Sequence, residues 1–225
     1  MARKSIDALS EAEMDRRIAK YEARPTAEQK AGGANRGTAW FVLIFGLIGA
    51  FASLQILLAE KALLKNPDQI LQCDFNPIVG CSQWIGQWQN ELFFGISNAL
   101  IGLAFFAGVS ALGLVLLSGG KFGRWLWQAW AAVHSLGMVW VFWFGYQSFV
   151  VENKLCPWCF LIWLINLALF AVVWMRSLQA GHWGVRATDT GRVLVRNRWW
   201  VLGALYLALV IFVVLWFWDS WYLVF

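Results

Sequence analysis

The sequence predicts an all-α integral membrane protein with five transmembrane helices. Of its 225 residues, 60% are hydrophobic and only 14% are charged, which is more apolar surface than a soluble domain can bury. Five stretches with few or no charges reach the roughly 20 residues needed to cross a bilayer as a helix. Only helices and closed β-barrels span a bilayer, and none of these stretches has the alternating apolar and polar residues of a barrel strand. The predicted spans are residues 39–59, 92–118, 125–151, 155–175 and 199–218.

The basic residues predict the orientation of these spans. Fifteen lysines and arginines fall in the segment before the first span, between the second and third, and between the fourth and fifth, against three on the opposite side (Lys61, Lys65 and Lys154). Basic residues are enriched in cytoplasmic segments. We therefore expect a cytoplasmic N-terminus and an extracytoplasmic C-terminus. The formal charge of +5 then reflects topology and contact with anionic lipid, and we expect no nucleic-acid partner.

The cytoplasmic segments carry no pattern of catalytic residues. Residues 1–38 form a basic tail, in which 5–20 have the apolar spacing of a short amphipathic helix, although a disordered tail explains them equally well. Pro25 and the Gly32–Gly33 pair are expected to separate this part from the membrane domain. Residues 179–198 form a polar cytoplasmic loop, and residues 199–225 comprise the fifth span and a short outer C-terminus.

A long extracytoplasmic loop, residues 60–94, follows the first span and is rich in turn-forming residues. Trp84 and Trp88 are spaced as on one face of a short helix, which predicts a helix lying in the membrane interface. We expect this loop to cap the mouth of the helix bundle.

The four cysteines carry the chemistry, because the predicted topology places all of them at the outer face. An even number on the oxidising side indicates disulfides. Cys73 and Cys81 lie eight residues apart in the turn-rich loop, whereas Cys156-Pro157-Trp158-Cys159 begins a predicted helix. Proline is favoured at the first position of a helix, and either Asn153 or Cys156 can serve as the N-cap of this helix. A thiol there faces the positive end of the helix dipole, which favours the thiolate.

Two other interpretations of these cysteines are possible. The four thiols could hold a structural zinc, but the loop pair lacks the usual ligand spacing and there is no second C-x-x-C motif, so we expect no metal. Two static disulfides could staple a membrane scaffold that has no enzymatic activity. A C-x-x-C ring is small and strained in a helix, which makes it a poor staple.

Three motifs in this order resemble the vitamin K epoxide reductase family. They are Cys73-Asp74-Phe75-Asn76-Pro77 with Cys81-Ser82, then Phe94-Gly95-Ile96-Ser97-Asn98-Ala99-Leu100-Ile101-Gly102, then Cys156-Pro157-Trp158-Cys159. DsbB-type oxidases carry their cysteine pairs in the reverse order and are less similar. The resemblance implies a four-helix bundle around a quinone over residues 39–178. It implies a bacterial disulfide-forming member that does the same task as DsbB, without a fused thioredoxin domain.

The resemblance also implies a path for electrons. Cys73 would receive them from a separate DsbA-like thioredoxin-fold protein, Cys81 would pass them to Cys156, and Cys159 would contact the quinone, menaquinone or ubiquinone. The enzyme would thus be a thiol:quinone oxidoreductase of the bacterial plasma membrane that supports disulfide formation in exported proteins.

The remaining expectations concern the quinone pocket. Asn98 matches the family asparagine that binds a quinone carbonyl, although it could instead cap a helix. Trp163 stands where animal members of the family have a tyrosine, which argues against the alternative substrate vitamin K epoxide. Trp158, Trp163 and Phe94 are candidate pocket walls.

Four further polar residues lie in or near the predicted spans. His134 and Asn166, inside the bilayer, are expected to be structural and hydrogen-bonded. Glu91 and Asp74 are candidates for tuning a thiol or passing a proton.

Overall fold

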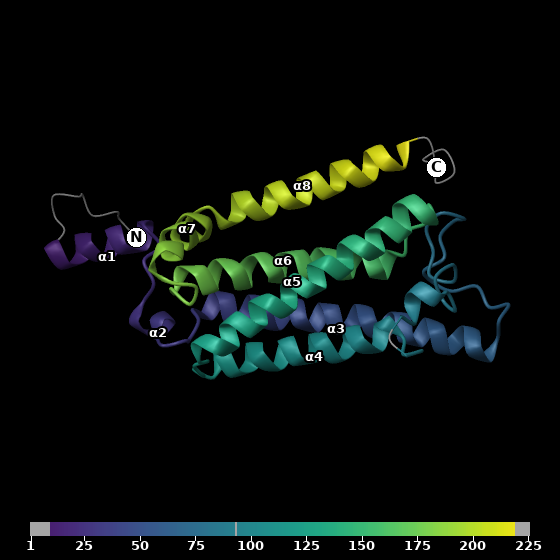
Figure 1. Ribbon diagram of the computed structural model, residues 1–225, viewed down its shortest axis with the longest axis horizontal. Coiled ribbons are helices and arrows are strands. Elements are labelled where there is room, and N and C mark those ends of the chain that lie inside the picture. The colour runs from purple at the N-terminus through teal and green to yellow at the C-terminus, as the bar shows by residue number, and fades with distance from the viewer. Residues whose placement is uncertain (1–9, 93, 219–225) are drawn as a thin grey trace, which may run out of the picture.

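The computed structural model describes residues 10–92 and 94–218, and its five long helices run lengthwise through the molecule (Figure 1). These are α3 (Arg36–Lys65), α4 (Asn98–Leu117), α5 (Arg124–Tyr146), α6 (Pro157–Gln179) and α8 (Arg198–Trp216). Three shorter helices gather at one end of the bundle: α1 (Glu11–Tyr21), α2 (Ala27–Lys30) and α7 (Val185–Arg196). The loop between α3 and α4 lies at the other end. The all-α membrane fold is confirmed.

Four of the described helices are long and apolar enough to cross a bilayer, namely α3, α4, α6 and α8. The fifth predicted span is the 23-residue helix α5, which is long enough but does not reach the same hydropathy. Its sequence includes five tryptophans, whose polar N–H groups lower the hydropathy of a helix. The helix is where the sequence predicts it, and its passage through the bilayer stays a prediction.

Helices α3 and α4 form the most extensive helix–helix contact in the bundle. Small residues permit this close approach, as is common between membrane helices. A Cβ atom on Gly46 would lie 2.9 Å from the backbone nitrogen of Ser110, and one on Gly113 would lie 2.7 Å from that of Leu43. The two backbones therefore meet where a larger side chain would push them apart.

The outer loop differs from its prediction in two respects. Helix α3 continues to Lys65, and α4 starts at Asn98, six residues later than the predicted span, because Gly95 has a φ of 75°. The predicted interfacial helix is wrong. Gly86 has a φ of 78° and interrupts it, so that Trp84 is buried while Trp88 is exposed.

The end of the bundle opposite this loop is more ordered than the sequence predicts. Residues of the N-terminal segment before α3 dock on the bundle: the indole of Trp127 donates to the carbonyl of Gly32 over 2.9 Å. Gly32 and its neighbour thus join the segment to the bundle instead of separating them. The predicted amphipathic helix is present as α1 over its described part, and residues 1–9 lie outside the described residues. The predicted polar loop contains α7.

The packing of α3 on α4 predicts unequal effects for two glycines of α4. Gly113→Ala should destabilise the protein by about 1–3 kcal/mol, because the new methyl group overlaps the backbone of α3. Gly108→Ala, with no atom within 4 Å of the new Cβ, should be neutral or stabilising by up to about 1 kcal/mol. Thermal unfolding of the two variants in the same detergent tests this. Equal shifts in melting temperature would contradict the close-packing account.

Candidate redox site

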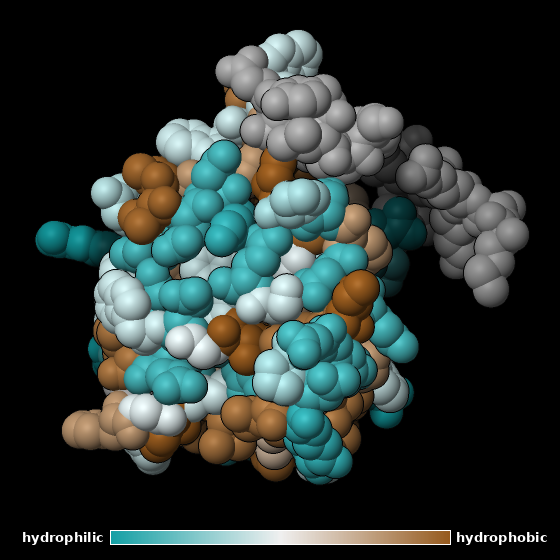
Figure 2. Space-filling model, turned by 90° about the vertical axis from the view of Figure 1, so that its right-hand side faces the viewer, coloured by the Kyte–Doolittle hydropathy of each residue, from teal (hydrophilic) through white to brown (hydrophobic). Residues whose placement is uncertain are grey.

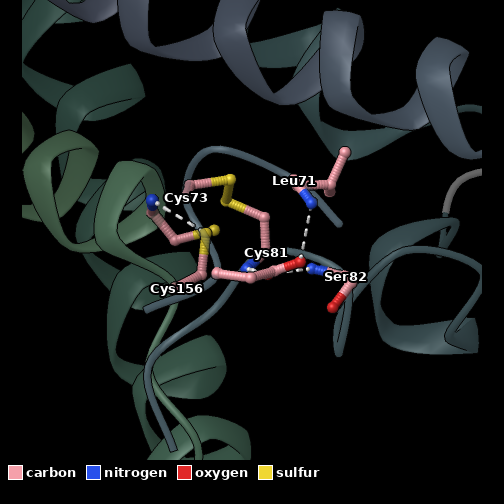
Figure 3. The surroundings of a disulfide bond; sticks show 7 residues. Leu71, Cys73, Cys81, Ser82 and Cys156 are labelled. Carbon is pink, nitrogen blue, oxygen red and sulfur yellow. Dashed lines mark hydrogen bonds between the residues drawn. A yellow bond between two sulfur atoms is a disulfide. The ribbon is translucent and has the colours of Figure 1, made fainter. Parts of the chain in front are cut away.

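The loop cysteines form a disulfide in the structure, Cys73–Cys81, which lies beneath the surface of the outer loop. The two side chains retain only 7% and 1% of their exposure. Both belong to the same apolar cluster as Cys156, and Figure 3 shows the disulfide beside that residue. The loop pair is thus held, oxidised, against the start of α6.

The carboxylate of Asp74 organises the ring that this disulfide closes. One oxygen accepts hydrogen bonds from the backbone nitrogens of Cys81 (2.7 Å) and Ser82 (3.0 Å), and the other accepts from that of Leu71 (3.2 Å). Partial burial raises the pKa of Asp74, but these hydrogen bonds outweigh it and hold the pKa below its ordinary value of 3.8. Asp74 is therefore an anionic clamp on the loop backbone.

Backbone pairing fixes the loop to the residue that precedes the C-x-x-C motif. The nitrogen of Gly80 donates to the carbonyl of Leu155 over 3.0 Å, and the nitrogen of Leu155 donates to the carbonyl of Ile78 over 2.8 Å. These bonds accompany an isolated parallel bridge between Val79 and Leu155. Cys81 and Cys156 each follow directly on a paired residue, so the pairing brings the two cysteine motifs together.

The helix cysteines are reduced in the structure and occupy the first turn of α6. Cys156 is the N-cap: its sulfur accepts a hydrogen bond from the backbone nitrogen of Cys159 over 3.3 Å, and Pro157 is the first helical residue. Hydrogen bonds from the thiol and backbone of Cys159 lower the pKa of Cys156, against the opposing effect of burial. Of the two caps that the sequence allows, Cys156 is the one used. Its thiolate is thereby favoured.

Cys159 lies at the wall of a cavity of about 330 Å³ between α3, α4, α5 and α6. Most of the lining is aliphatic or aromatic. The lining side chains with a polar atom are Asn90, Asn98, Trp140, Cys159, Trp163 and Asn166. A mainly apolar cavity with a few convergent polar groups is typical of a site for a small organic molecule.

Two of these lining side chains each have one buried polar atom without a hydrogen-bond partner. The Nδ2 atom of Asn98 donates to the carbonyl of Gln89 over 2.7 Å, and its Oδ1 atom is buried without a partner. Asn166 accepts a hydrogen bond at Oδ1 from His134 (3.2 Å), while its Nδ2 atom is buried and unpaired. Buried polar atoms of this kind are usually satisfied. The free Nδ2 atom of Asn166 can donate to a carbonyl, and the free Oδ1 atom of Asn98 can accept from a hydroxyl. The cavity therefore suits a molecule such as a quinone, which has carbonyls when oxidised and hydroxyls when reduced.

The sequence profile of the vitamin K epoxide reductase family matches residues 40–174, more than half of the chain. The chain belongs to the vitamin K epoxide reductase family. The family implies an oxidoreductase, and its members use quinones in general. No curated protein matches the chain.

Within this vitamin K epoxide reductase fold, the predicted pocket residues separate into two groups. Asn98 and Trp163 line the cavity together with Cys159. Trp158 is partly buried and packs edge-on against Phe51, outside the cavity lining. Phe94 has a fully exposed side chain and a φ of 55°, so it is a turn residue away from the cavity. The structure thus does not bring Phe94 or Trp158 to the pocket.

The alternative role of Asn98 as a helix cap is wrong. Ser97 is the N-cap of α4, and its hydroxyl accepts from the nitrogen of Ala99 over 3.2 Å. Asn98 is the first helical residue, which leaves its side chain free to turn towards the cavity. Ser97 is thus the residue that positions Asn98.

One functional candidate, Glu60, is absent from the sequence predictions. Its carboxylate accepts hydrogen bonds from Asn90 and from the hydroxyl of Ser97, each over 2.7 Å. It thereby joins the end of α3 to the start of α4 beside the cavity. The sequence does contain a signal for Glu60. It follows Ile56, which is buried, by four residues, so it lies on the same face of an apolar helix. Glu91, which was a candidate from the sequence together with Asp74, is exposed.

The clamp at Asp74 predicts how readily the loop disulfide opens. Asp74→Asn should speed reduction of Cys73–Cys81 by tris(2-carboxyethyl)phosphine, a reductant that acts at acidic as well as neutral pH, about tenfold, because a charged hydrogen bond is worth about 1.5–3 kcal/mol. In the unsubstituted protein, reduction should become this fast only at acidic pH. The Asp74 carboxylate stabilises the closed loop fully above pH 3.8, and this stabilisation is lost as the pH falls through the lowered pKa of Asp74.

Thiol labelling over time measures the rate of this reduction. Asp68→Asn, at an exposed position of the same loop, is the matched control and should leave the rate unchanged. Equal rates for the two variants would show that Asp74 does not hold the loop closed.

Proposed function

We propose that the protein is a thiol:quinone oxidoreductase of a bacterial plasma membrane that oxidises a separate DsbA-like thioredoxin-fold protein and reduces a membrane quinone. The observation that supports this proposal is the juxtaposition of two cysteine pairs, the disulfide of the outer loop and the two thiols at the start of α6. The loop that carries Cys73 and Cys81 is hydrogen-bonded through the backbone of Ile78 and Gly80 to the residue before Cys156. Cys159 lines a cavity in which two amide side chains have unpaired atoms.

The first exchange takes place at the loop pair. A thiolate of the reduced partner attacks the sulfur of Cys73, which breaks the Cys73–Cys81 bond and forms a mixed disulfide. The partner's second thiol then displaces Cys73, so the partner leaves oxidised and the loop pair keeps two electrons and two protons. Because the disulfide is buried, the loop must open for this attack.

The exposed surface around Cys73 favours such a partner. Figure 2 shows this end of the molecule, where hydrophobic side chains stand among hydrophilic ones. Ile70 and Phe75, within three residues of Cys73 in the chain, are 84% and 70% exposed, and Leu64 at the end of α3 is 84% exposed. Exposed apolar groups rimmed by polar residues are typical of protein–protein contact sites.

The second exchange moves the electrons to the helix pair. The Cys81 thiolate attacks Cys156 of an oxidised Cys156–Cys159 pair, Cys159 leaves as a thiolate, and Cys73 then displaces Cys156 to restore the loop disulfide. The hydrogen bonds at the N-terminus of α6 stabilise Cys156 as the thiolate leaving group.

A bound quinone, menaquinone or ubiquinone, would accept two electrons and two protons at the cavity. The chain's own groups account for its binding: apolar walls accept the ring and tail, Asn98 and Asn166 offer amide groups, and Cys159 supplies the reacting thiol. Trp163 has no hydroxyl with which to hold an epoxide oxygen, which argues against vitamin K epoxide as the substrate.

The distribution of charge supports an orientation with the cysteines outside. The described basic residues of α1, α7 and the segments next to them lie at the end of the bundle opposite the outer loop. The positive-inside rule then assigns that end to the cytoplasm.

Replacing Cys159 tests the proposed activity. Cys159→Ala should abolish reduction of a soluble menaquinone analogue by a reduced DsbA-like protein, because the thiol next to the cavity is lost. Absorbance of the quinone measures turnover. Turnover at the unsubstituted rate would rule the proposal out, and so would cysteines that stay oxidised throughout a redox titration, as a stapled scaffold predicts.

Replacing Asn98 tests quinone contact. Asn98→Ala should raise the KM for the quinone about tenfold, because the second hydrogen of Nδ2, beside the one that Gln89 accepts, is lost as a donor to the quinone carbonyl, a hydrogen bond worth about 1.4 kcal/mol. The KM for the thiol partner should stay the same. Asn197→Ala, between α7 and α8 at the opposite end of the bundle, is the control and should leave both KM values unchanged. An unchanged quinone KM in Asn98→Ala would remove this residue from the site.

A further inference from the structure

A second cavity lies at the basic end of the bundle, far from the cysteines. It measures about 140 Å³ and is enclosed by the start of α3, the end of α6 and the junction of α7 with α8. Figure 1 places these three boundaries at the end opposite the outer loop. The redox chemistry described above makes no use of this cavity.

Arg176 is the main polar group of this cavity and is incompletely paired. Its side chain is only 2% exposed. The Nη2 atom donates to the carbonyls of Gln29 and Gly33, and the guanidinium lies 4.9 Å from the ring centre of Trp127. The Nε and Nη1 atoms are buried without a partner. A buried guanidinium with free N–H groups at a cavity is suited to an anion, because a charged donor left unpaired costs stability.

The other groups around Arg176 strengthen the positive potential. The first turn of α3 borders the cavity through Gly37 and Thr38, and the N-terminus of a helix carries a partial positive charge. The N–H of Thr38 is already paired with the side chain of the N-cap residue Asn35. Arg198 also lines the cavity. Among the described residues that line it, there is no carboxylate to neutralise these charges.

The remaining walls are apolar and belong to membrane-spanning helices. They include Phe41 of α3, Val172 of α6 and Leu202 of α8. Trp199 lines the cavity and is 67% exposed, as is common for tryptophans at the level of lipid headgroups. A free phosphate would leave these apolar walls unused, whereas a phospholipid would cover them with its acyl chains.

We infer that this cavity binds the phosphate of an anionic phospholipid, such as phosphatidylglycerol, from the leaflet at the basic end of the bundle. The phosphate oxygens accept from the free nitrogens of Arg176 and from Arg198, while the chains run along α3 and α8. Basic cavities between helices on the cytoplasmic side are suited to such headgroups. Since Arg176 also holds the carbonyls of Gln29 and Gly33, the lipid would stabilise the docked N-terminal segment.

Native mass spectrometry of the full chain in detergent tests this inference. Phosphatidylglycerol should bind with a saturable affinity, and the zwitterionic lipid phosphatidylcholine should not. Arg198→Gln should weaken the binding of phosphatidylglycerol about fivefold, the effect expected of one arginine near an anionic lipid. We use Arg198 because replacing Arg176 would also release the N-terminal segment.

Arg196→Gln is the matched control. Arg196 is exposed two residues away and contacts the ring of Tyr21 outside the cavity, so its loss should leave the affinity unchanged. Equal affinities for the two lipids, or equal affinities in the two arginine variants, would overturn the inference. If inorganic phosphate competed with phosphatidylglycerol at equal concentration, the site would be one for a soluble anion, which also contradicts it.

Discussion

Two backbone hydrogen bonds, between residues 78–80 of the outer loop and Leu155, join the two halves of the redox site. Without them, the loop cysteines would belong to a long connection with no fixed position relative to α6. The pairing holds the loop at the residue before the C-x-x-C motif, and Asp74 fixes the turn that carries Cys81. A thiolate can then attack a neighbouring disulfide without a search over many conformations, which is the advantage of holding reacting groups close together.

The helix bundle contributes the second requirement, an apolar cavity that reaches Cys159. Close packing of α3 on α4 joins their inner halves through Gly46 and Gly113, and Gly102 of α4 meets Ser53 of α3 nearer the outer ends. Glu60 then bridges them through Asn90 and Ser97, next to the residue whose amide faces the cavity. Polar groups in a membrane domain are costly unless they are paired. The unpaired amides of Asn98 and Asn166 are therefore more consistent with a ligand site than with packing alone.

The sequence was sufficient for the parts of the fold that depend on hydrophobicity and local signals. Spans of about 20 apolar residues located the long helices, and Pro157 after Cys156 located the start of α6. It was insufficient where long-range contacts decide. Burial of Trp84 against Phe144 and the positive φ of Gly86 replaced the predicted interfacial helix. Arg176 donates hydrogen bonds to carbonyls more than 140 residues away in the chain, and no local sequence pattern predicts such a contact.

The central claim is that Cys81 and Cys156 exchange disulfide bonds directly. A variant with Cys73→Ser and Cys159→Ser leaves only these two thiols, so neither normal disulfide can form. Mild oxidation followed by proteolysis and mass spectrometry measures which peptides are linked. The account predicts an intramolecular disulfide between the peptides that contain Cys81 and Cys156. Two free thiols, or a link only between separate molecules, would contradict it.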